Sequence, residues 1–409
     1  MAKVMPFNGL LPIPEKASKV AAVPYDVVNS DEAFKIAEGN PLSFLRVSKP
    51  EIELEKGVDL YDDKVYIKAV ENFRRLCKNA PLQLDKEKHL YVYSLKMGEH
   101  IQTGIVAAVS VEDYDKNIIK KHEKTRKDKE DDRTKHIYLT KSHSGPVFLT
   151  YKDVANIDEL VTKAMTDSPL FDFTASDGIS HKLWRLSIEQ SEKISEIFDK
   201  VPFLYIADGH HRAASASRVG AKCKSDNSKH IGKEDYNFFL AVVFPSSQLR
   251  ILPYNRVVKD LNGLTVDEFK KKVSEKFEVS HSKPPSPEKQ GEFCMLIEGE
   301  WYNLKPLFDT SKFNVIDCLD VSILQNYILN PILGIDDPRT SKRIDFVGGI
   351  RGTGELEKLL KEGKAKVAFS MYPTTVKQMM DIADAGEIMP PKSTWFEPKL
   401  RDGLVCHNF

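Results

Sequence analysis

The sequence predicts a mixed protein of the α/β or α+β class, because helical and strand patterns alternate along its 409 residues. Hydrophobic residues make up 41% and charged residues 29%, a composition that allows a sizeable buried core. At roughly 150 residues per domain, this length predicts two or three domains. We expect an N-terminal segment over residues 1–85, a central core over 86–246 and a C-terminal α/β domain over 247–409. The last boundary falls where proline, serine and glycine cluster.

Individual elements follow from the spacing of apolar residues. Helical spacing predicts a helix over Val65–Cys77, and a capping box of Thr265 and Glu268 opens another. Residues 1–40 read as extended and turn-rich, and residues 152–200 show little periodicity. Two further helices are expected over Glu355–Lys361 and Thr375–Ala385. Strands, the first two of them neighbours, are expected over Leu90–Leu95, Gly104–Val111, Phe148–Tyr151, Val201–Ala207, Phe238–Phe244 and Lys366–Ser370.

Charge and cysteine usage argue against several functional classes. Basic and acidic residues number 60 each, so no global field favours nucleic acid or an anionic membrane. The five cysteines are scattered and form no C-x-x-C pair, which argues against a zinc ribbon, a redox dithiol or a disulfide framework. The N-terminus does not resemble a signal peptide, and no apolar run reaches the roughly 18 residues of a membrane span. We therefore expect a cytoplasmic protein that acts on small molecules, without nucleic-acid or membrane partners.

The segment from Asp208 to Arg212 is the strongest candidate for a functional site. It follows a predicted buried strand and precedes a run of small residues that suits a helix. The first turn of a helix leaves N–H groups unpaired and carries partial positive charge, which makes an anion site. His210, His211 and Arg212 add donors, and Gly209 allows close approach of the backbone. Asp208, the only anion of the segment, could hold Mg²⁺ or orient a histidine, and a zinc site is disfavoured because no third ligand lies at a short spacing.

A second candidate is His122-Glu123-Lys124-Thr125-Arg126, which lies in the most highly charged stretch of the chain. A carboxylate that accepts a hydroxyl proton must lie close to its substrate, and nearby cations keep it ionised. Glu123 suits that task. The alternative is a solvated helical face, which is what such charge runs usually form. The segment is not the zinc motif H-E-x-x-H, because its fifth residue is Arg126.

Two C-terminal clusters are weaker candidates. Residues 343–351 place paired glycines beside arginine, and residues 390–399 contain Lys392-Ser393-Thr394, which could bind an anion. Either could equally be a loop that packs on the rest of the protein. The chain contains neither G-x-x-x-x-G-K-[ST] nor G-x-G-x-x-G, so Walker-type or Rossmann chemistry is disfavoured.

These motifs together resemble a known family. The segments NPLSFLRVSKPE, KHEKT with EDDR, IADGHHRAASA and MPPKSTWFEPKLRDGL occur in this order between about residues 20 and 405. They are similar to a long, formerly uncharacterised family related to the SerK-like free-serine kinases. The resemblance implies a ParB/sulfiredoxin-like catalytic core with an N-terminal extension and a C-terminal α/β domain. It also implies phosphorylation of free L-serine to O-phospho-L-serine, with ADP as donor in short members and inorganic pyrophosphate in long members such as this chain.

The resemblance also implies roles for the residues of the two main segments. Glu123 corresponds to the catalytic base that takes the proton of the serine hydroxyl. Asp208 would bind Mg²⁺ or orient the loop, and His210 would act beside it in catalysis. Gly209, His211 and Arg212 would bind the phosphates, which suits phosphoryl transfer because that chemistry depends on positioning and electrostatics.

Further contacts are expected around this centre. Thr125, Arg126 and Arg133 would add contacts to the donor phosphates. Arg46, in the FLRV segment, and Lys392 are candidates for binding the carboxylate of the amino acid.

Other functions remain open from the sequence. The donor could be ADP or ATP, since an apolar adenine pocket leaves no motif. The same fold could support a nucleotide hydrolase or nuclease, although the neutral net charge argues against DNA. A non-catalytic phosphate sensor would need the Asp208–Arg212 loop but not Glu123 beside it. The oligomeric state is not predicted.

Overall fold

The computed structural model describes residues 1–79, 82–282 and 284–409, and it confirms the mixed class of helices and strands. The chain forms two compact units. The first comprises Met1–Leu249 together with Pro398–Phe409, and the second comprises Arg250–Glu397. This division differs from the expected one: residues 1–85 belong to the same unit as the core, and the end of the expected C-terminal domain returns to the first unit.

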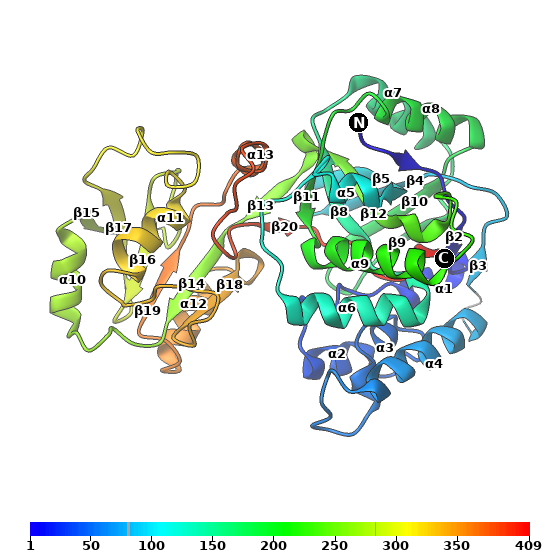
Figure 1. Ribbon diagram of the computed structural model, residues 1–409. Coiled ribbons are helices and arrows are strands. Elements are labelled where there is room, and N and C mark those ends of the chain that lie inside the picture. Colours follow the sequence, from blue (N-terminus) through cyan, green and yellow to red (C-terminus); the bar gives the residue numbers. More distant parts are fainter. Residues whose placement is uncertain (80–81, 283) are drawn as a thin grey trace. The chain divides into compact units, whose positions relative to one another are not determined.

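A large mixed sheet is the centre of the first unit (Figure 1). Its strands follow the order β6-β11-β8-β12-β5-β4-β10-β9, and β1 pairs with the end of β5. The strands predicted from β-branched and aromatic runs are present, and the expected neighbours β4 and β5 pair antiparallel. The bounds are β1 Val4–Met5, β4 Tyr91–Met97, β5 His100–Ser110, β6 Ile119–Lys120, β8 Val147–Tyr151, β9 Phe171–Thr174, β10 Ser180–Arg185, β11 Leu204–Asp208 and β12 Phe238–Pro245.

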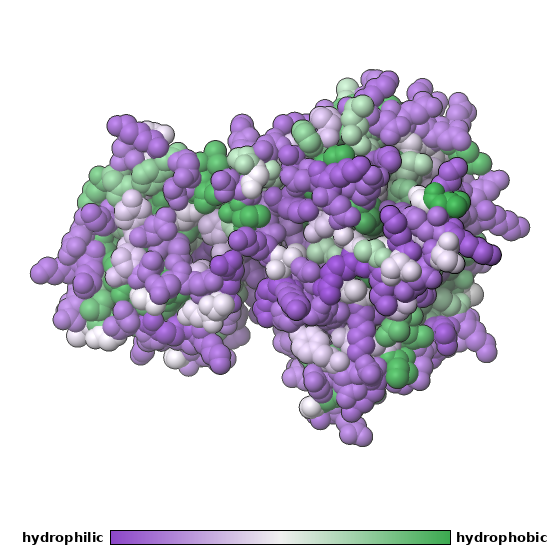
Figure 2. Space-filling model, viewed as in Figure 1, coloured by the Kyte–Doolittle hydropathy of each residue, from purple (hydrophilic) through white to green (hydrophobic). Residues whose placement is uncertain are grey.

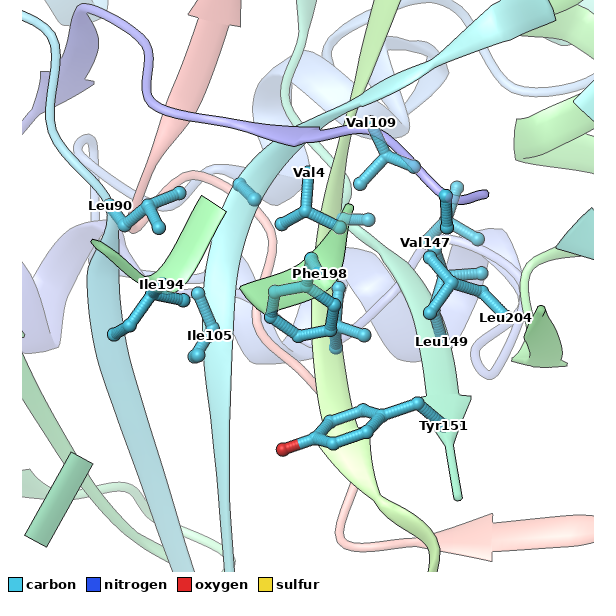
Figure 3. Close-up of a cluster of buried hydrophobic side chains, with 14 of the residues drawn as sticks. Val4, Leu90, Ile105, Val109, Val147, Leu149, Tyr151, Ile194, Phe198 and Leu204 are labelled. Atoms are coloured by element: carbon cyan, nitrogen blue, oxygen red, sulfur yellow. The ribbon is translucent and has the colours of Figure 1, made fainter. Parts of the chain in front are cut away.

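Two helices cover one face of the sheet, α7 (Ala155–Ala164) and α8 (Ile188–Phe198). Alternate side chains of the central strands meet Ile194 and Phe198 of α8 in a fully buried cluster (Figure 3). The prediction for residues 152–200 missed both helices and β9 and β10. Ser187 and Gln190 form a capping box that starts α8, but the helix buries only a narrow apolar stripe, so its period is weak in the sequence.

Helices α6 (Lys127–Thr140) and α9 (His210–Asp226) pack against each other in the first unit, as Figure 1 shows. The strongly charged stretch therefore ends in a helix, while residues 121–126 form the loop before it. The helix α4 (Asp63–Asn79) matches the predicted one and contacts α6. Helix α5 (Val111–Asp115) is short and packs on α9.

The N-terminal residues are more helical than predicted. They form α1 (Pro14–Val20), α2 (Ser30–Ala37) and α3 (Leu45–Ser48), which surround a second apolar cluster with Phe44 and Phe73. A small sheet of order β3-β2-β21-β7 joins both ends of the chain. Its strands are β2 Gly9–Leu11, β3 Gln83–Leu84, β7 Ser142–His143 and β21 Cys406–Asn408. Because β21 is its third strand, the C-terminal tail is anchored in the first unit.

The second unit is built on its own sheet, of order β15-β17-β16-β19-β14-β18. The predicted capping box at Thr265 and the helices and strand expected after residue 350 are confirmed. The bounds are β13 Arg250–Leu252, β14 Tyr254–Val258, α10 Val266–Ser274, β15 Phe277–His281, β16 Phe293–Ile297, β17 Glu300–Pro306, α11 Asp320–Leu324, β18 Ile344–Gly348, α12 Gly354–Lys361, β19 Val367–Ser370, α13 Val376–Asp384 and β20 Trp395–Glu397.

The surface is largely hydrophilic in the view of Figure 2, with scattered hydrophobic side chains. Among the described residues, no helix combines the length and the apolar character that crossing a membrane requires.

Candidate active site

Two loops of the first unit meet because the strands before them are parallel neighbours. The short strand β6 pairs with β11 in parallel register, Ile119 beside Leu204. The carboxyl ends of parallel strands lie at the same edge of a sheet. The loop of Glu123 and the loop of Asp208 therefore leave the sheet side by side, although they are far apart in the sequence.

The second loop turns directly into a helix, as predicted. Gly209 is its N-cap with a φ of 96°, a left-handed conformation that favours glycine. His210, His211 and Arg212 are the first three residues of α9. The N–H groups of this first turn have no acceptor within the helix, so they are donors available to an anion.

Glu123 lies at this helix start. Its Oε2 is 3.8 Å from Nδ1 of His210, whose side chain is only 4% exposed. The N–H of His122 donates to Nε2 of His210 at 3.4 Å, so the ring proton of a neutral His210 is on Nδ1 and faces the carboxylate. Burial lowers the pKa of His122 to about 4 and that of His210 well below its usual value, and the neighbouring His122 and His211 lower the pKa of His210 further. Both rings are therefore neutral at pH 7.

The next histidine is tied to the neighbouring loop. The N–H of Arg126 donates to Nε2 of His211 at 3.0 Å, which leaves the proton of a neutral His211 on Nδ1. The guanidinium of Arg126 is at the surface, 64% exposed, and pairs with Asp128 at 2.8 Å. The Thr125 hydroxyl donates to Glu130. Both side chains are near the helix start by chain connectivity, and both already have protein partners.

Asp208 is held by cations on two sides. Lys399 Nζ lies 3.0 Å from its Oδ2 and Arg212 Nη2 lies 3.7 Å from the same oxygen. Burial acts to raise the pKa of Asp208, but Lys399 and Arg212 outweigh it and hold the pKa far below its usual value. Lys399 belongs to the C-terminal tail, which returns to the first unit. The sequence analysis named residues 390–399, the cluster that ends with Lys399, but gave Lys399 itself no role.

This pairing bears on the expected role of Asp208 as a Mg²⁺ ligand. A carboxylate already neutralised by an ammonium and a guanidinium attracts a cation weakly. The described residues also contain no group of three or more His, Cys, Asp or Glu side chains that could hold a metal ion. Asp208 is therefore already paired with two cations, and its expected role as a Mg²⁺ ligand stays a prediction.

Arg212 is directed inward rather than toward the helix start. The residue is 6% exposed, and its Nη1 donates to the carbonyl of Pro146. Burial acts to lower its pKa, but the carboxylates around it, first Asp26 and then Asp208, raise the pKa above its usual value. Arg133 is also largely buried: it pairs with Asp132 at 2.8 Å and lies over the ring of Tyr25 at 4.1 Å.

The two candidates for the amino-acid carboxylate both contact other groups of the protein. The guanidinium of Arg46 donates to Glu53 at 2.6 Å and to the carbonyls of Ala37 and Asn40 at 2.8 and 3.0 Å. These bonds close the turn between α2 and α3, so Arg46 has a structural role, and its expected role in binding stays a prediction. Lys392 belongs to the second unit, where its ammonium lies 5.6 Å from the centre of the Tyr254 ring.

Residues 4–322 match the family model described as "Protein of unknown function (DUF1015)", and the chain belongs to this family. No curated protein matches the chain. Similar solved structures include a free serine kinase variant in complex with AMP, with 12% identity, a TM-score of 0.39, and coverage of 74% of this chain and 91% of that chain.

Two further structures are similar to the same degree. One is SbnI from Staphylococcus aureus, truncated at its C-terminus, with 10% identity, a TM-score of 0.40, and coverage of 73% of this chain and 85% of that chain. The other is a conserved hypothetical protein from Pyrococcus furiosus, with 13% identity, a TM-score of 0.37, and coverage of 74% and 94%.

Proposed function

We propose that this protein is a phosphotransferase that phosphorylates free L-serine to O-phospho-L-serine, with inorganic pyrophosphate as donor. One observation carries the proposal: the carboxylate of Glu123 lies 3.8 Å from His210 at the amino end of α9. A helix start offers N–H donors to phosphate oxygens, and a carboxylate beside it can accept a proton. The identity of acceptor and donor rests on the resemblance of the motifs.

Each step of the proposed reaction can be assigned to a group of the site. The serine hydroxyl oxygen attacks phosphorus while its proton passes to Glu123. The bridging P–O bond breaks, and inorganic phosphate leaves with the electron pair. The Nδ1–H of His211 and the N–H groups of the first turn of α9 stabilise the negative charge on the transferred group, while the Nδ1–H of His210 faces Glu123.

Lys399 adds an ammonium group near these neutral donors. Its ammonium contacts the carboxylate of Asp208, which directly precedes the N-cap of α9. The positive charge of Lys399 is therefore held beside the helix start, and the carboxylate has a partner. Asp208 is thus a positioning residue for Lys399 and Arg212. Magnesium enters the reaction as the counter-ion of pyrophosphate, as part of the substrate.

The first experiment identifies acceptor and donor. Purified protein with Mg²⁺ and L-serine is given pyrophosphate, ADP or ATP in separate reactions, and phosphoserine is measured. We expect product with pyrophosphate. Product only with a nucleotide would overturn the choice of donor, and no product with any donor would overturn the kinase and leave a hydrolase or a sensor.

The second experiment tests the base. Glu123→Gln keeps the size of the side chain and removes the proton acceptor, so we expect kcat to fall by on the order of 10²–10⁴. Glu112→Gln is the matched control, because that carboxylate is 56% exposed at the surface and pairs with Lys3 and Lys116. Unchanged turnover in Glu123→Gln would remove Glu123 from the mechanism.

A further inference from the structure

The loop that carries Glu123 consists of residues 121–126, between the end of β6 and the start of α6. It forms neither helix nor strand, so regular hydrogen bonds do not fix its backbone. Each residue that is fixed in such a loop loses conformational entropy. A general base must nevertheless lie within hydrogen-bond reach of the proton that it removes. Other contacts therefore have to hold this loop in place.

Two main-chain hydrogen bonds connect the loop to the start of α9. The N–H of His122 donates to Nε2 of His210 at 3.4 Å, and the N–H of Arg126 donates to Nε2 of His211 at 3.0 Å. The first bond is long, and the acceptor of each bond is a ring nitrogen rather than a charged group. Neither bond therefore has the strength of a charge-assisted hydrogen bond.

The carboxylate of Glu130 supplies such a charge-assisted contact. Glu130 lies in the first turn of α6, and its Oε1 accepts a hydrogen bond from the hydroxyl of Thr125, two residues after Glu123. Its Oε2 pairs with Nη1 of Arg218, a residue of α9, at 3.3 Å. One side chain therefore joins three segments: the loop of the base, the helix that follows this loop and the helix that carries His210.

The surroundings of Glu130 favour a firm contact. Helices α6 and α9 pack against each other (Figure 1), and the Ser215 hydroxyl of α9 donates to the carbonyl of Glu130 at 3.2 Å. The Glu130 side chain is only 21% exposed, so salt and solvent screen its contacts less than those of a surface pair. Asp131 pairs with Arg218 from a more exposed position. The single hydroxyl proton of Thr125 goes to Glu130, so Asp131 shares the arginine without holding the loop.

We propose that Glu130 is a positioning residue for the base of the reaction. By accepting the Thr125 hydroxyl and pairing with Arg218, it fixes residues 121–126 against α9 and keeps the carboxylate of Glu123 beside His210. This inference rests on the proposed function, because Glu123 is the base of that reaction. It assigns a role to the first residue of the EDDR segment, which had none from the sequence.

Kinetics with pyrophosphate and L-serine compare two variants that remove the same hydrogen bond, Glu130→Ala and Thr125→Val. A misplacement of about 1 Å can cost on the order of 10²-fold in rate, so we expect kcat to fall by about 10–100-fold in each variant, with little change in the KM for pyrophosphate. The double variant should lose no more than either single variant, since both substitutions break one bond. Glu130→Gln keeps an oxygen that can accept from Thr125, so it should recover most of kcat.

Asp131→Ala is the matched control, because it removes a carboxylate from the same arginine and should leave kcat unchanged. An unchanged kcat in Glu130→Ala, an equal loss in Asp131→Ala, or a Glu130→Gln variant as slow as Glu130→Ala would each overturn the proposal. A double variant whose loss is the product of the single losses would do the same. So would a KM for pyrophosphate that rises in Thr125→Val but not in Glu130→Ala, because Thr125 would then act on the donor directly.

A second readout needs no turnover. In protein that carries isotopically labelled histidine, the NMR resonance of His210 Nδ1 reports on the Glu123 carboxylate 3.8 Å away. The variant Glu123→Gln gives the position of this resonance without the carboxylate. Glu130→Ala and Thr125→Val should shift the resonance toward that position, and Asp131→Ala should not. A resonance that stays in place in both variants would refute the positioning role.

The two proposals can fail separately. If no donor yields phosphoserine, the kinase is refuted, and the His210 resonance still decides whether Glu130 positions Glu123. If phosphoserine forms with the same kcat in Glu130→Ala as in the unaltered chain, the kinase stands and the positioning role is refuted. Thr125→Val breaks the bond from the side of the loop, so the test does not depend on the folding of Glu130→Ala.

Discussion

Replacing Lys399 with methionine tests how the C-terminal tail holds the candidate site. The substitution keeps the length of the side chain and leaves Asp208 with Arg212, 3.7 Å away, as its nearest cation. Exposed ion pairs are worth about 0.2–1 kcal/mol, whereas breaking a buried pair costs about 3–5 kcal/mol. Lys399 is 11% exposed and Asp208 27%, so we expect an intermediate loss of about 2–3 kcal/mol in the free energy of unfolding.

Urea denaturation of Lys399→Met, Asp208→Asn and the double variant measures this loss and the coupling between the two side chains. The double variant should be more stable than Lys399→Met, because it no longer buries an underpaired carboxylate. Loss of Lys399 raises the pKa of Asp208, so the difference from the unaltered protein should shrink as the pH falls and Asp208 becomes protonated. Lys377→Met is the control, from a pair with Asp381 in which the lysine is 83% exposed. A loss as small as that of this control would refute the argument.

Three further predictions concern the same unit. Between pH 6.5 and 5 we expect the free energy of unfolding to fall by on the order of 1–4 kcal/mol per pH unit, as measured by urea denaturation. Burial lowers the pKa of several histidines to about 3 or 4, so the unfolded chain binds protons on these histidines before the folded chain does. Buried acids of raised pKa, such as Asp402, reduce this loss of stability because they bind protons first in the folded chain. A stability that does not change with pH in this range would contradict the prediction. Gly209→Ala should cost about 1–3 kcal/mol and lower kcat, because its φ is 96° and its Cβ would lie 2.9 Å from Nε of Arg212; stability equal to that of the unaltered chain would show that the loop adapts. Arg46→Met should cost about 2–3 kcal/mol and leave the KM for serine unchanged; a raised KM would restore Arg46 to the substrate site.

The sequence could predict the local part of the site but not the part contributed from a distance. A buried apolar run followed by Asp-Gly and small residues can adopt few local structures. The strand β11, the turn and α9 were therefore predictable. The meeting of Glu123 and His210 depends on the parallel pairing of β6 with β11, and β6 is too short to leave a pattern. Lys399 and Asp402 arrive because β21 pairs with β2 and β7, a register that no local spacing encodes.

The sequence analysis treated His210, His211 and Arg212 alike, as donors to one anion, but helix geometry separates their side chains. His210 and Arg212 are two positions apart in α9, so their side chains point about 200° from each other around the helix axis. One therefore faces Glu123 at the start of the helix while the other enters the buried cavity beside Asp402. A phosphate clamp built from every cationic residue of the motif would need them on one side, which a regular helix does not allow.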